Sequence, residues 1–311
     1  MKLAIFWLSY LWFPFLIISI YAIWRLKDWR RYLILVCVLL SLPLAWARFV
    51  EPRILIVHEA TIELPGFKSE QVDGVRVGLI ADLHIGIFSH AVSTQRIINE
   101  LNDANVDLIL IAGDFTYDLH PEDVTVAFAA LAQAEAPIYA VLGNHDVGFP
   151  GEIYGESLYG PLRDMGVTFV ENRSVEWTNG AQSLIVSGTS DLWQRAYDFD
   201  FASNFPDDVP VLMLTHNPDM ALTVPVGVRY DLMLAGHTHG GQIRLPIPGL
   251  TRSVIPTQYP FDHGLHRLRN AGSPKEALVY VTPGTGMIGL PMRFRRPPRI
   301  DILTLSTEQS G

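Results

Sequence analysis

Clusters of histidine, carboxylate and amide residues recur along the chain, and their side chains are of the types that bind divalent metal ions. The clusters are D-x-H, G-D, G-N-H-D, an isolated histidine and G-H-x-H, in that order. With no thiolate among them, these donors suit Mn²⁺, Fe or Zn²⁺, and also Mg²⁺, whereas copper and iron–sulfur sites need softer ligands. The candidate metal ligands are Asp82, His84, Asp114, Asn144, His216, His237 and His239.

The number of these donors predicts two ions that share one carboxylate. Two ions about 3.5–4 Å apart are the usual arrangement for in-line displacement at phosphorus, and they lower the pKa of a water toward 7. Taken singly, Asp82 or Asp114 could cap a helix and Asn144 could hold a turn. Taken together, they would bury many polar groups at one rim, and such burial requires the compensating charge that a metal supplies.

The elements that must position these side chains are short apolar segments, most of which end at one of the clusters. Their alternation with amphipathic segments predicts an α/β domain whose strands are buried on both faces. Ligands of open α/β sheets bind beyond the carboxyl ends of the strands, so we expect the clusters to converge on one rim. The predicted strands are 54–64, 75–82, 107–114, 137–144, 183–188, 209–216, 231–237 and 277–283, and the predicted helices are 91–103, 121–134 and 156–165.

The ordered set of clusters resembles the calcineurin-like metallophosphoesterase superfamily over residues from about 75 to 305. Segments 236–246 and 281–300 further resemble its bacterial membrane-associated branch. The resemblance implies a two-sheet sandwich flanked by helices, and an enzyme that hydrolyses phosphoesters with two divalent metal ions.

The resemblance also implies a role for each residue. It assigns the first ion to Asp82, His84 and His239, and the second to Asn144, His216 and His237, with Asp114 bridging the two. His145 then acts on the leaving oxygen or on the transition-state charge, so the expected catalytic residues are His145 and Asp114. One departure is Tyr117, which stands where the family usually has an acidic residue.

The N-terminal 50 residues differ from the rest in being apolar and basic. Residues 3–24 carry no charge and are long enough to span a bilayer core. Residues 32–47 would form a helix of only about 24 Å, unless the flanking Arg31 and Arg48 reach toward the interfaces. We therefore expect one or two transmembrane helices in residues 1–50 and a metallophosphoesterase domain in residues 51–311.

An alternative for the second apolar segment is an export signal. The pair Arg30-Arg31 precedes the segment, and the small-x-small sequence at 45–47 would allow cleavage after Ala47. Either interpretation predicts the same sidedness, because the loop at 25–31 carries a net charge of +3 and basic loops stay cytoplasmic. The catalytic domain would then face outward from the inner membrane.

The net charge argues against one class of partner, and the cysteine content excludes one kind of cross-link. Residues up to Arg53 carry a net charge of +5, which leaves −14 for the remainder of a chain with −9 in total. An acidic body of this kind argues against a nucleic-acid partner, which requires a basic surface. The single cysteine, Cys37, excludes a disulfide framework.

These observations predict a phosphoesterase or pyrophosphatase that acts on a membrane lipid or a lipid-linked substrate. The alternatives are a UDP-diacylglucosamine-type pyrophosphatase on the cytoplasmic face, a catalytically silent binding scaffold of the same fold, and a nuclease. The arginine-rich tail 292–299 either binds anionic headgroups or forms a solvated loop. We expect residues 246–264, which are rich in proline and glycine, to form a long surface loop.

Overall fold

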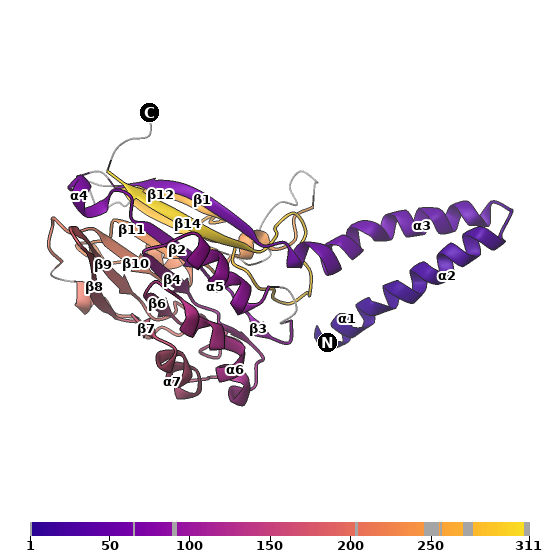
Figure 1. Ribbon diagram of the computed structural model, residues 1–311, viewed down its shortest axis with the longest axis horizontal. Helices are drawn as coiled ribbons and strands as arrows, with labels where there is room; N and C mark the ends of the chain where they lie inside the picture. The colour runs from indigo at the N-terminus through magenta and orange to yellow at the C-terminus, as the bar shows by residue number, and fades with distance from the viewer. Residues whose placement is uncertain are drawn as a thin grey trace.

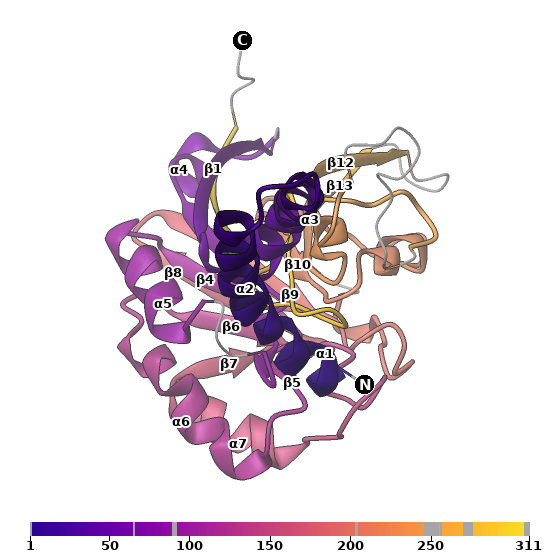
Figure 2. The same ribbon diagram turned by 90° about the vertical axis from the view of Figure 1, so that its right-hand side faces the viewer.

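The computed structural model describes residues 2–64, 66–88, 92–202, 205–245, 255, 257–269 and 276–307. The catalytic part contains two six-stranded sheets, and a helical hairpin projects from one end of it (Figures 1 and 2). The first sheet has the order β1 (Ile56–Glu63), β14 (Arg299–Ser306), β2 (Arg76–Ile80), β4 (Leu108–Ala112), β6 (Ile138–Val141) and β7 (Val167–Phe169).

The second sheet is packed against the first. Its strand order is β12 (Gly264–Arg269), β13 (Glu276–Val281), β11 (Leu232–Ala235), β10 (Val211–Leu214), β9 (Gln182–Gly188) and β8 (Arg173–Asn179). A separate two-stranded sheet joins β3 (Ile85–Gly86) to β5 (Thr116–Tyr117). These two short strands directly follow the D-x-H and G-D clusters.

Helices and short helical turns complete the chain. The N-terminal hairpin contains α1 (Lys2–Leu8), η1 (Ser9–Leu11), α2 (Trp12–Arg25), α3 (Arg30–Ala45), η2 (Trp46–Val50) and η3 (Glu51–Arg53). The catalytic part contains α4 (Ser69–Val72), α5 (Thr94–Asp103), η4 (Pro121–Asp123), α6 (Val124–Phe128), η5 (Ala129–Gln133), α7 (Glu156–Asp164), η6 (Asp200–Ala202), η7 (Pro218–Leu222) and η8 (His239–Gly241).

Three apolar layers hold these elements together. Alternate residues of each strand face opposite sides, so Val77 and Leu79 of β2 pack between the sheets, against Leu212 and Leu214 of β10. The other face of the first sheet packs against α5, α6 and α7, and the other face of the second sheet packs against η7. The predicted sandwich flanked by helices is confirmed.

The strands β3, β5, β7, β8 and β12 were not predicted, and neither was β14. It lies between β1 and β2, parallel to β1 and antiparallel to β2, and so completes the first sheet with residues from the far end of the chain. The eight predicted strands are present with bounds that differ by up to three residues, and the predicted helix at 121–134 is divided into η4, α6 and η5. The expectation that the strands are buried on both faces is wrong for β1, most of whose residues are exposed or half-buried. Most of the predicted loop at 246–264 lies outside the described residues.

The hairpin consists of two apolar helical segments, Lys2–Arg25 and Arg30–Arg53, each of 24 residues. By length and composition both could cross a membrane, and most of their apolar side chains are exposed. The second segment is longer than the sequence indicated because η2 and η3 continue the helical path of α3. The indole nitrogen of Trp12 donates a hydrogen bond to Ser41 Oγ at 3.0 Å and ties the two segments together.

The expectation that Arg48 extends toward a lipid–water interface is wrong. Its side chain is buried, and its Nε donates a hydrogen bond to Ser9 Oγ at 2.9 Å. Its guanidinium lies 4.5 Å from the ring centre of Phe6 and 4.9 Å from that of Phe49. Cation–π contacts of this kind are stronger away from water, so Arg48 joins the end of the second segment to the start of the first.

A polar bridge crosses the core between the two sheets. Asp301 on β14 is fully buried, and its Oδ1 accepts a hydrogen bond from the Tyr280 hydroxyl on β13 at 2.8 Å. The same oxygen lies 2.8 Å from Nη2 of Arg299 and 3.0 Å from Nδ1 of His58. A buried carboxylate with these partners is costly to remove, because the partners are left without an acceptor.

We therefore expect Asp301→Ala to lower the free energy of unfolding by about 3 kcal/mol, the usual cost of breaking a buried charged pair. Urea denaturation followed by circular dichroism measures the change. Thr304→Ala on the same strand is the matched control and should cost less than about 1 kcal/mol. An equal loss in the two variants would contradict the importance of the bridge.

Candidate metal centre

The structure brings all seven candidate metal ligands together at one rim. Asp82 and His84 follow β2, Asp114 follows β4, and Asn144 follows β6, so four donors come from the first sheet. The other three, His216, His237 and His239, follow β10 and β11 of the second sheet. Each of the seven is at most 4% exposed. The centre therefore lies at the seam between the sheets.

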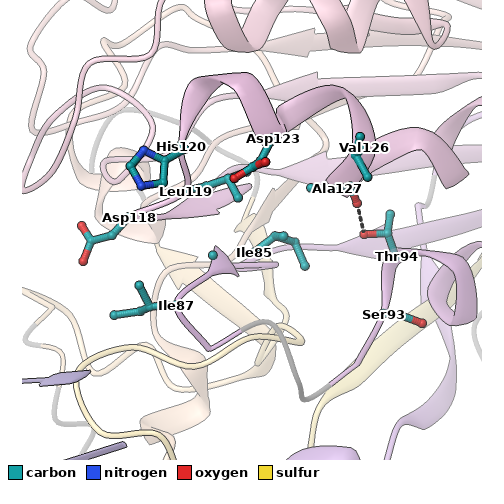
Figure 3. A pocket seen from close by; sticks show the side chains of 11 residues that line it. Ile85, Ile87, Ser93, Thr94, Asp118, Leu119, His120, Asp123, Val126 and Ala127 are labelled. Atoms are coloured by element: carbon teal, nitrogen blue, oxygen red, sulfur yellow. Dashed lines mark hydrogen bonds between the residues drawn. The ribbon is translucent and has the colours of Figure 1, made fainter. Parts of the chain in front are cut away.

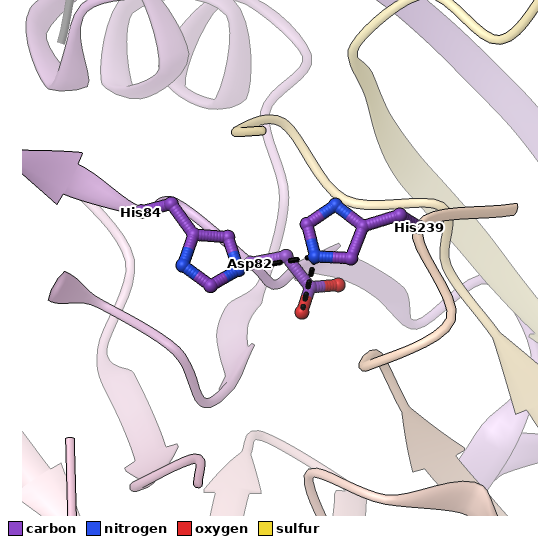
Figure 4. Close-up of side chains that lie close together, drawn as sticks. All are labelled: Asp82, His84 and His239. Atoms are coloured by element: carbon purple, nitrogen blue, oxygen red, sulfur yellow. Dashed lines mark hydrogen bonds and ion pairs between the residues drawn. The ribbon is translucent and has the colours of Figure 1, made fainter. Parts of the chain in front are cut away.

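One half of the centre contains Asp82, His84 and His239, whose side chains point toward one another (Figure 4). His84 Nε2 and His239 Nε2 are 3.0 Å apart. His239 Nε2 is 3.6 Å from Asp82 Oδ1. The two nitrogen atoms face each other at the distance of a hydrogen bond, and a cation between them would accept both lone pairs.

The other half contains Asn144, His216 and His237. Asn144 Oδ1 lies 3.0 Å from His216 Nε2 and 3.0 Å from His237 Nδ1. Asp114 connects the halves, because its Oδ2 is 3.4 Å from His84 Nε2 and 3.2 Å from His216 Nε2. His216 Nδ1 lies 2.8 Å from the Ala112 carbonyl oxygen, which keeps a proton on Nδ1 and directs Nε2 into the centre.

The backbone at the centre is strained. Among the donors, Asp82, His84, Asp114, His237 and His239 have φ values between 45° and 69°. Residues with side chains rarely adopt this left-handed conformation, and such strain is concentrated at functional sites. The carboxylates help to hold it, since Asp82 accepts a hydrogen bond from the His237 backbone nitrogen at 3.0 Å and Asp114 accepts one from His145 at 2.9 Å.

Close packing explains two glycines of the clusters. A Cβ atom on Gly143 would lie 2.2 Å from Asp114 Oδ1, and one on Gly236 would lie 2.5 Å from the Ala81 Cβ. Only glycine allows these loops to pass so close to the carboxylates.

Asp146 has a function that the sequence did not reveal. It is fully buried and accepts hydrogen bonds from the backbone nitrogens of Gly143, Phe115 and Thr116 at 3.0–3.1 Å and from the Thr116 hydroxyl at 2.8 Å. It thereby fixes the loop of Asn144 against the loop of Asp114. The signal was present as the last residue of G-N-H-D.

The electrostatics of the cluster favour a bound cation. Burial raises the pKa of Asp82 to about 7 and lowers the pKa values of His84 and His237 to about 3. Burial opposes ionisation of Asp114, but nearby His216 outweighs it and lowers the pKa of that carboxyl. Despite its burial, His216 has a pKa raised to about 10 by Asp114.

These shifts fit the donors to divalent metal ions. His84 and His237 are neutral at pH 7 and present lone pairs, as ligation requires. Asp82 lacks enough positive charge nearby to remain ionised, and a cation would supply it. Two groups, one of Asp82, His84 and His239 and one of Asp82, Asp114 and His216, have donor atoms that all lie within 4.8 Å of one another.

His145 and Tyr117 lie beside the donors. The His145 side chain is largely buried, and its ring centre is 5.1 Å from that of His84 and 5.1 Å from that of Tyr117. Both contacts are edge-to-face, with interplanar angles of 82° and 84°. Tyr117 therefore packs against the imidazole and limits its orientation.

The arginine-rich tail is only partly solvated, because Arg295 is exposed whereas Arg293 is not. Arg293 is fully buried and donates hydrogen bonds to the carbonyl oxygens of Gly286, Arg296 and Pro283 at 2.8–3.1 Å. Its Nη2 is also 3.4 Å from His239 Nδ1. Arg293 thus contacts the centre through His239. Because its guanidinium donates to protein carbonyls, it is not available to bind a lipid headgroup.

Two hollows are lined by residues from other parts of the catalytic domain than the candidate ligands themselves. One has a volume of about 560 Å³ and is lined by Ile85, Ile87, Asp118 and residues of α5 and α6 (Figure 3). The other has a volume of about 810 Å³ and includes Trp193, whose ring centre is 4.8 Å from that of His237. The second hollow therefore adjoins the centre at His237.

Comparison with known proteins identifies the family. A family model for calcineurin-like phosphoesterases matches residues 75–241, which contain every candidate metal ligand. The phosphodiesterase YaeI of Escherichia coli is 31% identical over 237 residues, covering 74% of this chain and 82% of that protein.

Two further relatives cover more than four fifths of this chain. The metallophosphoesterase YkuE of Bacillus subtilis is 29% identical, covering 84% of this chain and 89% of YkuE. A zebrafish (Danio rerio) protein named as a transmembrane protein with a metallophosphoesterase domain is 29% identical, covering 82% of this chain and 57% of that protein. Among solved structures, the NAD nucleotidase of Haemophilus influenzae has a TM-score of 0.43 at 14% identity, covering 68% of this chain and 45% of that one.

The pKa shifts predict how metal binding depends on pH. In the metal-free protein, Asp82 holds a proton below a pH of about 7 and His216 holds one below about 10, and both must leave on ligation. Affinity for Mn²⁺ should therefore rise from pH 5.5 to 8.5. Calorimetric titration in buffers of different ionisation enthalpy should detect protons released on binding, and more of them at pH 6 than at pH 8. Binding without proton release would contradict this assignment.

Proposed function

The chain belongs to the calcineurin-like phosphoesterase family and is a metal-dependent phosphoesterase, and we propose that it hydrolyses a phosphodiester in the headgroup of a membrane lipid. We further propose that residues 1–50 are its membrane anchor and residues 51–311 its catalytic domain. The name of YaeI, a phosphodiesterase, supports the choice of a diester.

One observation carries the lipid assignment: the start of the first apolar helix is built into the rim of the metal centre. Phe6 is only 3% exposed, in contrast to its neighbour Trp7 at 66%. It packs in one apolar cluster with Phe88, Tyr117 and Met287. Because Tyr117 also contacts His145, a bilayer around the hairpin would lie close to the centre, where a lipid headgroup can enter from the membrane surface.

We propose that the seven donors hold two divalent ions, with Asp82, His84 and His239 on one, Asn144, His216 and His237 on the other, and Asp114 between them. Ions bound there would neutralise charge on the phosphoryl oxygens and lower the pKa of a water. The mixture of carboxylate, imidazole and amide donors suits Mn²⁺, Fe or Zn²⁺.

The chain's own residues handle the leaving group. We propose that His145 donates a proton to the leaving oxygen as the phosphorus–oxygen bond breaks. Burial lowers the pKa of His145, so the imidazole is neutral before substrate binds, and the negative charge of a bound phosphate favours its protonation. Asp114 and Tyr117 position this histidine, the first through the backbone nitrogen and the second through the ring.

Two alternatives fit less well. A silent scaffold would not need the complete donor set that the structure brings together. A nuclease would need a basic surface, whereas residues beyond Arg53 carry a net charge of −14.

The substrate assignment is tested with the purified full chain in mixed micelles. Phosphatidic acid, phosphatidylglycerol and a UDP-linked lipid represent the phosphomonoester, the phosphodiester and the pyrophosphate. We expect Mn²⁺-dependent hydrolysis of phosphatidylglycerol above the other two. Hydrolysis of soluble bis(p-nitrophenyl) phosphate with none of the lipids turned over would reject a lipid substrate.

The roles of His145 and Asp114 are separable. His145→Ala should lower kcat by about 10²–10⁴, the usual contribution of a positioned acid, while metal content stays near that of the wild type. Asp114→Asn should lower the content of both ions, because that carboxylate is proposed to contact both. Elemental analysis and steady-state kinetics measure the two effects. Loss of metal from His145→Ala would mean that the histidine is a ligand.

The sidedness of the membrane anchor decides which substrates the enzyme can meet. Lys2 contacts the catalytic part and Arg53 leads into β1, whereas the loop with a net charge of +3 lies at the opposite end of the hairpin (Figure 1). A reporter that is active only outside the cytoplasm, fused after Gly311, should therefore be active. Replacing Arg25, Lys27, Arg30 and Arg31 with Asn should weaken that activity. A reporter active only in the cytoplasm would favour a cytoplasmic lipid-precursor pyrophosphatase instead.

A further inference from the structure

The first apolar helix carries a positive charge to the metal centre. The Lys2 ammonium lies 4.2 Å from the centre of the Tyr117 ring. Because Tyr117 contacts His145 at 5.1 Å, the ammonium is no more than about 9.3 Å from the centre of the His145 ring. Lys2 therefore lies at the edge of the centre on the side of β3 and β5.

The position of Lys2 is fixed by the residues that follow it. Phe6, one helical turn further on, stacks on Phe88 with ring centres 5.8 Å apart and an interplanar angle of 21°. Arg48 holds Phe6 and Ser9 from the second helical segment. This buried anchor point keeps the backbone of Lys2 beside the catalytic part while its long side chain remains movable.

The side chain of Lys2 is only loosely engaged. Its Nζ is 3.7 Å from Asp118 Oδ2, and the two side chains are 42% and 49% exposed. Exposed ion pairs of this kind contribute little stability, so an anion that approaches can replace the aspartate. Two arginines near the rim are engaged with protein carbonyls, since Arg293 donates to Pro283 and Arg296 donates to Gly240.

We propose that Lys2 binds a second anionic group of the substrate, adjoining the phosphate that is cleaved. Two phosphates joined by a three-carbon linker can reach from His145 to Lys2. The first membrane helix would then be part of the substrate-binding site, and the enzyme would prefer headgroups that carry two phosphates. This inference rests on the proposed function, because it places the cleaved phosphate beside His145.

Asp118 weakens the preference for headgroups with two phosphates. It pairs with Lys2 and also lines the 560 Å³ hollow together with Asp123 (Figure 3). Its carboxylate competes with the second anionic group for the ammonium. Removing the lysine and removing the aspartate should therefore change the preference in opposite directions.

The test compares inhibition by cardiolipin, whose headgroup has two phosphates, with inhibition by phosphatidylglycerol, which has one. Each lipid competes in mixed micelles with the full chain's hydrolysis of bis(p-nitrophenyl) phosphate. A lipid that binds the site competes whether or not it is cleaved, so the result stands apart from the success of the lipid-hydrolysis assay. The measured quantity is the ratio of the two inhibition constants.

Lys2→Met should reduce the preference for cardiolipin about tenfold, the usual effect of losing one charge-assisted contact. Lys2→Arg should retain it, and Asp118→Asn should increase it. Arg53→Met is the matched control, because it removes one charge at the same end of the hairpin without touching the centre, and it should leave the ratio as in the wild type. A Lys2→Met ratio equal to that of the wild type would overturn the proposal, as would an equal loss in Arg53→Met.

Two soluble compounds show whether the second anionic group must belong to a lipid. Glycerol 1,3-bisphosphate and glycerol 1-phosphate repeat the comparison without acyl chains. If their ratio depends on Lys2, the site accepts the two-phosphate headgroup in free form as well as in a lipid. If only the lipid pair depends on Lys2, the second group is recognised in the lipid alone. If neither pair does, the proposal fails.

Discussion

Two carboxylates buried in the seam between the sheets impose the constraint on which the structure depends. Asp82 and Asp114 have almost no contact with water, so their charge must be compensated from within the protein. Each carboxylate accepts a backbone hydrogen bond from a loop that follows another strand, and each faces imidazole rings. The left-handed backbone at five donors and the glycines at 143 and 236 are what allow the loops to come so close.

Much of this centre could be predicted because it depends on local signals. A short apolar segment followed by aspartate or histidine identifies both a buried strand and the donor at its end, and the structure brings together every donor so predicted. The strand β14 lacked such a signal. Its sequence, RIDILTLS, mixes charged and apolar residues, and its neighbours in the sheet are β1 and β2, more than 200 residues earlier in the chain. Its partners could not be predicted, because pairing over that distance depends on contacts between segments that are far apart in the sequence.

Arg293 and Phe6 show that the composition of a segment does not determine the environment of each residue in it. A basic residue in an arginine-rich tail is normally solvated, yet Arg293 is buried because several carbonyl oxygens converge on its guanidinium. An aromatic residue in an apolar helix normally faces lipid, yet Phe6 is buried because Phe88 and Tyr117 meet it. Composition describes the average environment of a segment, whereas the exceptions arise from contacts between distant parts of the chain.

The donors come from both sheets, and this affects the stability of the protein before it binds its ions. The chain has one cysteine, Cys37, and thus has no disulfide to join its layers. Ions held by the proposed ligands would serve as that cross-link, connecting residue 82 to residue 239 and closing a loop of more than 150 residues. Because the loop is long, such a cross-link would greatly lower the conformational entropy of a chain whose sheets have separated. A copy without ions would separate most readily along the seam and expose its inter-sheet core, and it would then be cleaved by proteases more readily than the metal-bound protein.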